Sequence, residues 1–155
     1  MRIVKLAVIA VSATLGMASV SAHAASAASA ADTARTYGVW RNPKDSVHLE
    51  IKDCGETACG VVIWASDRAK ADARKGGSPN LVGLRLLRDF APDKNGAWRG
   101  KVFVPDLNMT FSGAAEVLDT NTLRAKGCVL GGIICKSQIW TRVDAASIIA
   151  STATR

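Results

Sequence analysis

Four cysteines are the residues in this sequence whose type and spacing could most directly do chemistry. They form two local pairs, Cys54 with Cys59 and Cys128 with Cys135, with four and six residues between the partners. Thiols can form disulfides, bind zinc or act as nucleophiles. Neither spacing is the Cys-x-x-Cys of a redox site, and neither matches the short spacings of zinc knuckles. The sequence therefore favours two disulfides over a metal site or a catalytic thiol.

The pairing of the cysteines is open to three arrangements, of which the local one has the best support. Cys54 and Cys59 flank the sequence Gly-Glu-Thr-Ala, which suits a short hairpin connection. Cys128 and Cys135 flank a segment with glycines at positions 131 and 132. If these glycines form a two-residue turn, the cysteines lie opposite each other at a Cα separation of roughly 4.5–5.5 Å, which a disulfide can span. A disulfide between residues 54 and 128 would contradict this pairing.

Side chains suited to acid–base or hydrolytic chemistry are few. His48 is the one histidine after residue 24, and Asp45 and Glu50 are its acidic neighbours in the sequence. On an alternating strand its ring points away from the apolar face, so we interpret it as a surface histidine. Asp53 and Glu56 could act as a carboxylate pair on a glycoside, but two acids beside a hairpin are typical turn residues. Nucleophile-elbow, phosphate-loop and His-Glu-x-x-His motifs do not occur in the sequence. We therefore predict no catalytic residue, no metal and no cofactor, in a protein that is not an enzyme.

The N-terminus has the pattern of a secretory signal peptide. Arg2 and Lys5 form a short positive segment, residues 6–20 are largely apolar, and Ala22-His23-Ala24 fits a small-x-small cleavage site. The apolar run is shorter than the ~20 residues of a membrane-spanning helix. Cleavage after Ala24 removes the two cations and lowers the formal charge from +7 to +5. These features predict a periplasmic or secreted protein that is not an integral membrane protein.

The rest of the chain has the length of one folded domain. The full sequence has 155 residues, and residues 25–36 are rich in alanine and serine without a large apolar side chain to bury. We therefore predict a signal peptide over residues 1–24, a flexible leader over 25–36, a β-barrel domain over 37–144 and a disordered tail over 145–155.

A period of two dominates the sequence from Tyr37 onward. Val47, Leu49 and Ile51, for example, alternate with polar residues, which is typical of a half-buried strand. The expected strands cover residues 38–41, 47–52, 59–64, 82–90, 98–104, 110–118, 122–129 and 134–143. About eight short sequential strands favour an all-β fold, a small antiparallel barrel closed from a meander, with a sandwich as the alternative. Such a barrel is filled by side chains or holds one small ligand.

One segment, residues 66–77, is predicted to be a short helix. Ser66 can cap its N-terminus, and Asp67 suits the positive end of the helix dipole. Lys75 suits the negative end, and the glycines at 76 and 77 stop the helix. The segment is alanine-rich and charged, so we interpret it as a connector or a lid between two strands.

Several short sequence motifs, in their order along the chain, resemble one bacterial family. They include Tyr-Gly-Val-Trp-Arg-Asn-Pro at 37–43, Ala-Cys-Gly-Val-Val-Ile-Trp at 58–64, Trp-Arg-Gly-Lys-Val-Phe-Val-Pro at 98–105 and Ser-Gln-Ile-Trp-Thr-Arg-Val at 137–143. Over residues 37–143 the chain is similar to domain-of-unknown-function family 2147. This resemblance implies an exported single domain with a lipocalin-like barrel and implies no particular activity.

The ends of the predicted barrel also resemble those of lipocalins. Gly38 and Trp40 match the lipocalin Gly-x-Trp of the first strand, and Arg142 is similar to the arginine of the last strand. The resemblance implies that the Arg142 guanidinium covers the Trp40 ring and closes one end of the barrel, a structural contact of about 0.5–2 kcal/mol.

Two functions remain open at this point. In the first, the barrel binds a small hydrophobic ligand such as a lipid or fatty acid, and Trp64, Trp98 and Trp140 line its pocket. Small residues at Gly113, Ala114 and Ala115 could leave space for it. In the second, a filled barrel acts as a structural or interaction protein and presents a basic surface to an anionic envelope. Export argues against nucleic acid as a partner of the basic residues, which are Arg68, Lys70, Arg74, Lys75, Arg85, Arg88, Arg99 and Lys101.

Overall fold

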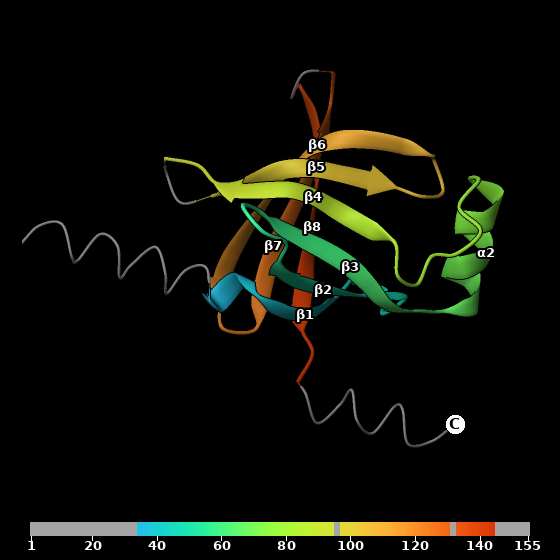
Figure 1. The fold of residues 1–155 in the computed structure, drawn as a ribbon, viewed down its shortest axis with the longest axis horizontal. Helices are drawn as coiled ribbons and strands as arrows, with labels where there is room; N and C mark the ends of the chain where they lie inside the picture. Colours follow the sequence, from blue (N-terminus) through green and yellow to red (C-terminus); the bar gives the residue numbers. More distant parts are fainter. Residues whose placement is uncertain (1–33, 95–96, 131–132, 145–155) are drawn as a thin grey trace, which may run out of the picture.

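The computed structural model describes residues 34–94, 97–130 and 133–144, which form a closed barrel of eight antiparallel strands (Figure 1). The strands follow one another around the barrel in chain order, and pairing between the first and the last closes it. They are β1 (Gly38–Arg41), β2 (Val47–Asp53), β3 (Ala58–Ala65), β4 (Arg85–Pro92), β5 (Trp98–Val104), β6 (Met109–Asp119), β7 (Thr122–Val129) and β8 (Ile134–Arg142). The predicted all-β barrel is confirmed, and the alternative sandwich is wrong.

Alternation along each strand decides which side chains form the core. In β2, Leu49 and Ile51 are buried, whereas Lys52 is exposed. The register places Leu49 opposite Trp40 of β1 and opposite Val62 of β3, and both of these residues are fully buried. Side chains at directly opposed positions lie on the same face of a sheet. The inward face of the first three strands is therefore continuous and apolar, as the period of two predicted.

The predicted helix is α2 (Asp67–Lys75), which joins β3 to β4 at one side of the barrel (Figure 1). The Ser66 hydroxyl accepts a hydrogen bond from the Ala69 amide at 3.2 Å, so the predicted N-cap is present. The helix contributes one buried residue, Ala73, to the core. At its C-terminus Gly76 lies so close to the carbonyl of Pro105 that a Cβ would collide with it. The helix is a connector that rests against the β5–β6 turn.

Strand β4 begins three residues later than the sequence predicted. Residues 81–84 form a turn, in which the Leu84 amide donates to the Leu81 carbonyl at 3.1 Å. Gly83 has φ +88°, a conformation that breaks an extended strand and favours glycine. Residues 82–84 are apolar like a strand, but the glycine conformation ends the extended backbone there.

Both disulfides follow the local pairing. Cys54 is bonded to Cys59, and Cys128 is bonded to Cys135. Cys128 and Cys135 lie directly opposite each other in the β7–β8 register, as the sequence predicted. With their sulfurs in disulfides, these cysteines offer no thiolate to a zinc ion.

The folded body begins before the predicted boundary at residue 37. Residues 34–36 are helical, and Thr36 is 3% exposed. The Thr36 carbonyl accepts a hydrogen bond from Nε1 of Trp40 at 3.0 Å, so the end of the predicted leader is part of the structure. The predicted signal peptide over residues 1–24, most of the predicted leader and the predicted tail over 145–155 lie outside the described residues. Among those that are described, no helix is long and apolar enough to cross a membrane.

Candidate functional site

One end of the barrel is closed by Arg142, near the end of β8. Its guanidinium carbon lies 4.1 Å from the centroid of the Trp40 ring, so the predicted cation–π contact is present. The guanidinium also donates to the carbonyls of Thr120 at 2.7 Å, of Tyr37 at 2.8 Å and of Arg35. Burial lowers the pKa of Arg142, but a guanidinium stays charged in proteins. One side chain therefore ties the β6–β7 turn and the N-terminal segment to the first strand.

Gly38 makes room for this closure. Its φ is +125°, which side chains other than hydrogen rarely adopt, and a Cβ would lie 2.5 Å from Nη1 of Arg142. The Gly-x-Trp pattern therefore has a physical reason. The glycine admits the guanidinium, and the tryptophan two residues later receives it.

The middle of the barrel is filled rather than hollow. Phe90 of β4 is 3% exposed, and its ring lies over Gly100 of β5 and Gly113 of β6, which are opposite each other. A Cβ at Gly113 would collide with Val102 and lie 3.3 Å from the Phe90 ring. The prediction that the small residues 113–115 leave a cavity is wrong here, because the larger side chains of neighbouring strands occupy the space. Ala114 faces outward in any case, since it pairs with Arg99.

The inward face of the β7–β8 hairpin, in contrast, has free space. Gly127 pairs with the inward Gly113, yet a Cβ at Gly127 would meet nothing within 4 Å. The inward residues of β8 opposite it are Lys136, then Gln138, then Trp140 toward the closed end. Lys136 and Gln138 are exposed, whereas Trp140 packs against the core. We call this surface, formed by Gly127, Lys136, Gln138 and Trp140, the open face.

Trp140 carries the one unusual polar group of the open face. Its Nε1 is buried and has no hydrogen-bond partner among the described residues. A buried donor without a partner costs about 1–3 kcal/mol, so native structures usually pair it. The described residues therefore leave the N–H of Trp140 without an acceptor, in a position that solvent does not reach.

The other two tryptophans of the predicted pocket lie elsewhere. Trp98 is 6% exposed and fills the core beside Tyr37, with ring centroids 6.3 Å apart. Trp64 pairs with His48, and an irregularity in the β2–β3 register between His48 and Leu49 puts this pair on the outer face. The structure thus separates Trp64 from the other two tryptophans. The sequence could not show this, because a bulge reverses the alternation at a single position.

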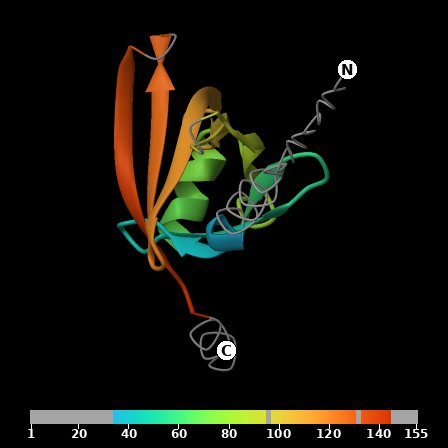
Figure 2. The same ribbon diagram turned by 90° about the vertical axis from the view of Figure 1, so that its left-hand side faces the viewer.

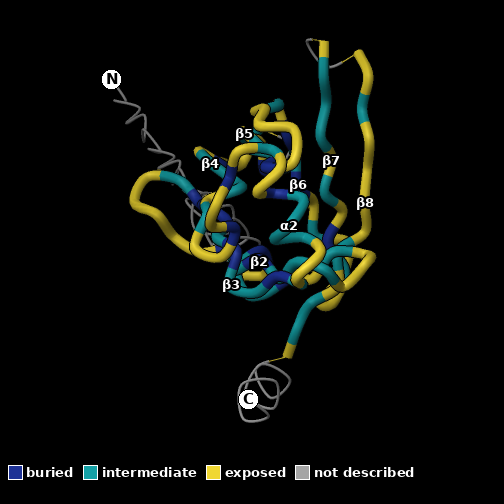
Figure 3. Tube along the Cα trace, turned by 90° about the vertical axis from the view of Figure 1, so that its right-hand side faces the viewer, coloured by how far each residue is buried: buried dark blue, intermediate teal, exposed yellow. Residues whose placement is uncertain are grey.

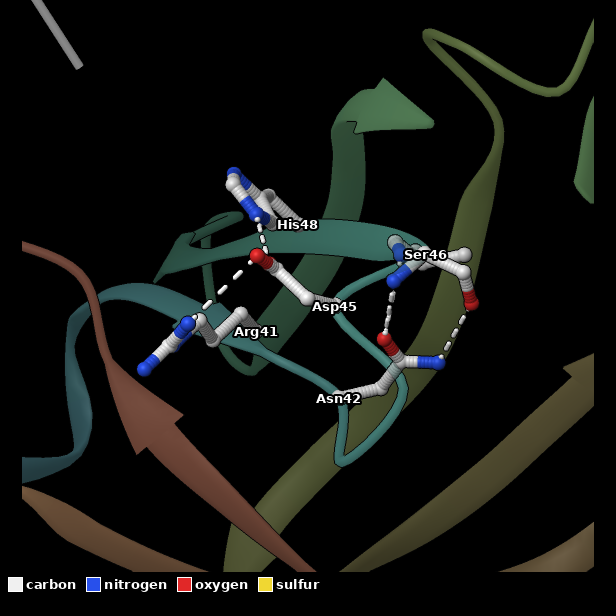
Figure 4. Close-up of polar contacts among 6 residues, drawn as sticks. Arg41, Asn42, Asp45, Ser46 and His48 are labelled. Carbon is white, nitrogen blue, oxygen red and sulfur yellow. Dashed lines mark hydrogen bonds and ion pairs between the residues drawn. The ribbon is translucent and has the colours of Figure 1, made fainter. Parts of the chain in front are cut away.

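His48 belongs to a polar cluster in the β1–β2 turn (Figure 4). Its Nε2 lies 2.7 Å from a carboxylate oxygen of Asp45, and its ring lies 4.6 Å from that of Trp64. Arg41 is 3.4 Å from the other Asp45 oxygen. The hydrogen bond with His48 lowers the pKa of Asp45, and the charges of His48 and Arg41 act in the same direction. Within the part of the chain that the structure describes, the His48 ring contacts the Asp45 carboxylate and the Trp64 indole.

The same turn is organised by Asn42. Its side-chain oxygen accepts from the amides of Ser46 and Val47 at 2.8 and 3.1 Å, and its nitrogen donates to the Ser46 hydroxyl at 2.9 Å (Figure 4). These bonds hold Asp45 at φ 47°, a left-handed conformation that aspartate tolerates. The cluster has the contacts of a well-ordered turn, and within the part of the chain that is described no group of three or more His, Cys, Asp or Glu could hold a metal.

The closed barrel and its arginine–tryptophan end define a lipocalin-like fold. A solved structure of protein HP1028 from the human pathogen Helicobacter pylori, described as belonging to the lipocalin family, matches with a TM-score of 0.56 at 15% identity. The match covers 74% of this chain and 86% of that one, and it shows a shared fold. No curated protein matches the chain. The chain belongs to the family described as "Uncharacterized protein conserved in bacteria (DUF2147)", whose model matches residues 38–142.

Proposed function

We propose that this protein binds a small ligand with an apolar body and a hydrogen-bond acceptor, such as a lipid or fatty acid, on the open face. The buried and unpartnered N–H of Trp140 carries this proposal. An acceptor on a ligand would satisfy it and recover most of the desolvation cost. Eight-stranded barrels of this size accommodate one small ligand in other proteins, lipocalins among them.

The residues around Trp140 indicate the chemistry of the ligand. The space over Gly127 and the indole ring of Trp140 offer contact to an apolar chain. Gln138 and Lys136 follow on the same face and add an amide and an ammonium group. Lys136 lies on the same inward row as Trp140, four positions nearer the hairpin end, and its positive charge suits a carboxylate, so a fatty acid fits this face better than the corresponding alcohol.

Titration of the delipidated protein with a fluorescent fatty acid tests the proposal. Trp140→Phe removes the N–H but keeps a ring, so we expect about five- to tenfold weaker binding, equivalent to one hydrogen bond. The Trp140 ring packs against the core, so thermal unfolding of the ligand-free variant is measured alongside to separate binding from folding. Trp64→Phe is the matched control, because Trp64 lies on the outer face. Lys136→Gln should weaken binding of the fatty acid more than of its alcohol. Equal affinity of the wild type and Trp140→Phe would refute the site.

Native mass spectrometry of protein purified without detergent tests for a resident ligand. A stoichiometric extra mass that is removed by solvent extraction supports the binding function. An apo mass without uptake from a lipid panel supports the alternative function, an interaction protein with a filled barrel. That alternative is favoured by the packing of Phe90 over Gly100 and Gly113, which leaves the barrel centre without space.

The protein is further proposed to act outside the cytoplasm, by binding rather than by catalysis. Two disulfides support export, because they persist in oxidising compartments. Fractionation of cells that express the full chain, or a chain without residues 1–24, tests the location. Retention of the full chain in the cytoplasm would contradict it.

A further inference from the structure

The end of the β7–β8 hairpin is the most exposed apolar part of the described chain. Leu130, Ile133 and Ile134 are 69%, 84% and 53% exposed, and we call these three residues the hairpin tip. Leu130 and Ile133 are joined by a hydrogen bond from the Ile133 amide to the Leu130 carbonyl. Large apolar side chains grouped at one exposed point indicate an interaction site.

The hairpin tip stands clear of the barrel (Figures 2 and 3). Pairing between β6 and β7 ends where Ser112 faces Cys128, whereas pairing between β7 and β8 continues to Val129 opposite Ile134. The Cys128–Cys135 disulfide joins the two strands at the level where β6 leaves them. A covalent link at this level holds the projecting end together as one unit.

The charge of this hairpin has a single sign. Between Asp119 and Asp144 the sequence contains no acidic residue. Of the four cations there, Arg124 forms an ion pair with Glu116 of β6 at 3.0 Å and Arg142 lies at the closed end, so Lys126 and Lys136 are the cations nearest the hairpin tip. Lys126 pairs with the outward Ala114, and Lys136 pairs with the inward Gly127, so the two lysines extend from opposite faces of the hairpin. Lys126 lies four positions from Leu130, and Lys136 lies two positions from Ile134, which corresponds to about 7–13 Å of extended strand.

We propose that the hairpin tip inserts into the surface of a membrane that contains anionic lipids. Apolar groups of a membrane-surface element enter about 5–10 Å below the headgroups, and flexible lysine side chains reach back to the headgroups. The spacing between the tip and the two lysines fits these dimensions. Because the hairpin sequence has basic residues and no acidic ones, we expect it to bind an anionic lipid surface more tightly than a neutral one.

Flotation of the protein with liposomes tests this proposal. The vesicles contain phosphatidylglycerol and phosphatidylethanolamine, or phosphatidylcholine alone, and the protein carries no added ligand. The double variant Leu130→Ser/Ile133→Ser should reduce the bound fraction at least tenfold. Leu118 is an exposed leucine at the far end of β6, so the matched control Leu118→Ser should bind as the wild type does. Lys126→Gln with Lys136→Gln should weaken binding to anionic vesicles about tenfold or more. Lys75→Gln in α2 is the control for loss of charge alone.

A spectroscopic variant places the tip at the membrane. Ile133→Trp should gain quenching by brominated lipids that Leu118→Trp does not gain. No flotation with anionic vesicles would overturn the proposal, and so would equal binding to phosphatidylcholine or unchanged binding of the Leu130→Ser/Ile133→Ser variant. Self-association that these serine substitutions abolish, without vesicle binding, would assign the tip to a second copy of the chain instead. Fatty acid titration in solution should not change in the tip variant, so this result is independent of the ligand-binding function.

Discussion

Alanine substitution at two paired glycines provides the strongest test of which part of the barrel interior is packed and which part is open. Gly113 and Gly127 face each other across β6 and β7, and both are on the inward side. A Cβ at Gly113 would collide with Val102, whereas a Cβ at Gly127 would meet nothing within 4 Å. Neither backbone is in the left-handed region, so the comparison isolates packing. We expect Gly113→Ala to destabilise the protein and Gly127→Ala to leave it unchanged or slightly more stable.

The size of the difference follows from two opposing effects. Forcing an extra methyl group into a packed core costs about 1–3 kcal/mol. Replacing glycine by alanine in a compatible conformation contributes about 0.4–1 kcal/mol through the unfolded state. Gly113→Ala should therefore lose about 1–2 kcal/mol of unfolding free energy, and Gly127→Ala should gain up to about 1 kcal/mol. For a domain of ~100 residues, 1 kcal/mol corresponds to about 4–8 °C in Tm.

Urea and thermal unfolding, followed by far-ultraviolet circular dichroism, measure both variants. Val102→Ala should relieve the collision, so the double variant with Gly113→Ala should be more stable than the sum of the single effects predicts. An equal loss in Gly113→Ala and Gly127→Ala would show that both sides of this strand pair are packed. The open face, and with it the proposed ligand site, would then be refuted.

Three further predictions concern the parts that hold the barrel together. Arg142→Lys should lower the free energy of unfolding by about 2–3 kcal/mol, because one ammonium cannot keep three carbonyl partners and the contact with the Trp40 ring. A loss below about 0.5 kcal/mol in chemical unfolding would contradict the role of Arg142 in closing the barrel end. The pKa of Asp45 is lowered in the folded state, so its contribution is present above pH ~3.8 and is lost as the pH falls through the lowered value. Asp45→Asn should cost less than about 1 kcal/mol at pH 7, since the pair is exposed, and the difference from wild type should shrink as the pH is lowered below ~3.8. Ser66→Ala should cost about 1 kcal/mol by removing the helix cap, and hydrogen exchange should be faster in α2 alone.

Much of the fold could be predicted from local patterns. The alternation of Leu49 and Ile51 with polar residues, the Ser66 cap and the position of the cysteines are all local signals, and each appears in the structure as expected. The contact between Arg142 and Trp40 that closes one end of the barrel could be predicted only through the resemblance to lipocalins. The hydrogen bonds from Arg142 connect residues more than 100 positions apart in the sequence, which no local pattern contains.

The candidate site was harder to predict because two long-range effects decide it. One bulge places Trp64 on the outer face although its neighbour Val62 is buried inside. One aromatic ring, Phe90, fills the space above Gly113 that composition suggested would be empty. The space lies instead at Gly127, which the sequence analysis did not single out. The sequence signal for this space was a glycine inside a predicted strand, because such a glycine marks either a bulge or a position that another group, such as a ligand, can approach closely.

The inward row of β8 changes character along its length in a way that stability alone does not explain. It begins with Arg142 over Trp40, continues with Trp140, and then passes through Gln138 and Lys136 to the apolar tip. Polar side chains suit the exposed positions of Gln138 and Lys136, but stability alone does not explain why the described residues leave the Trp140 N–H without an acceptor. The proposed ligand, lying along this row, would pair this donor and fill the space over Gly127. The row also leads from the tip to Trp140, so the two proposed binding regions share one strand, β8.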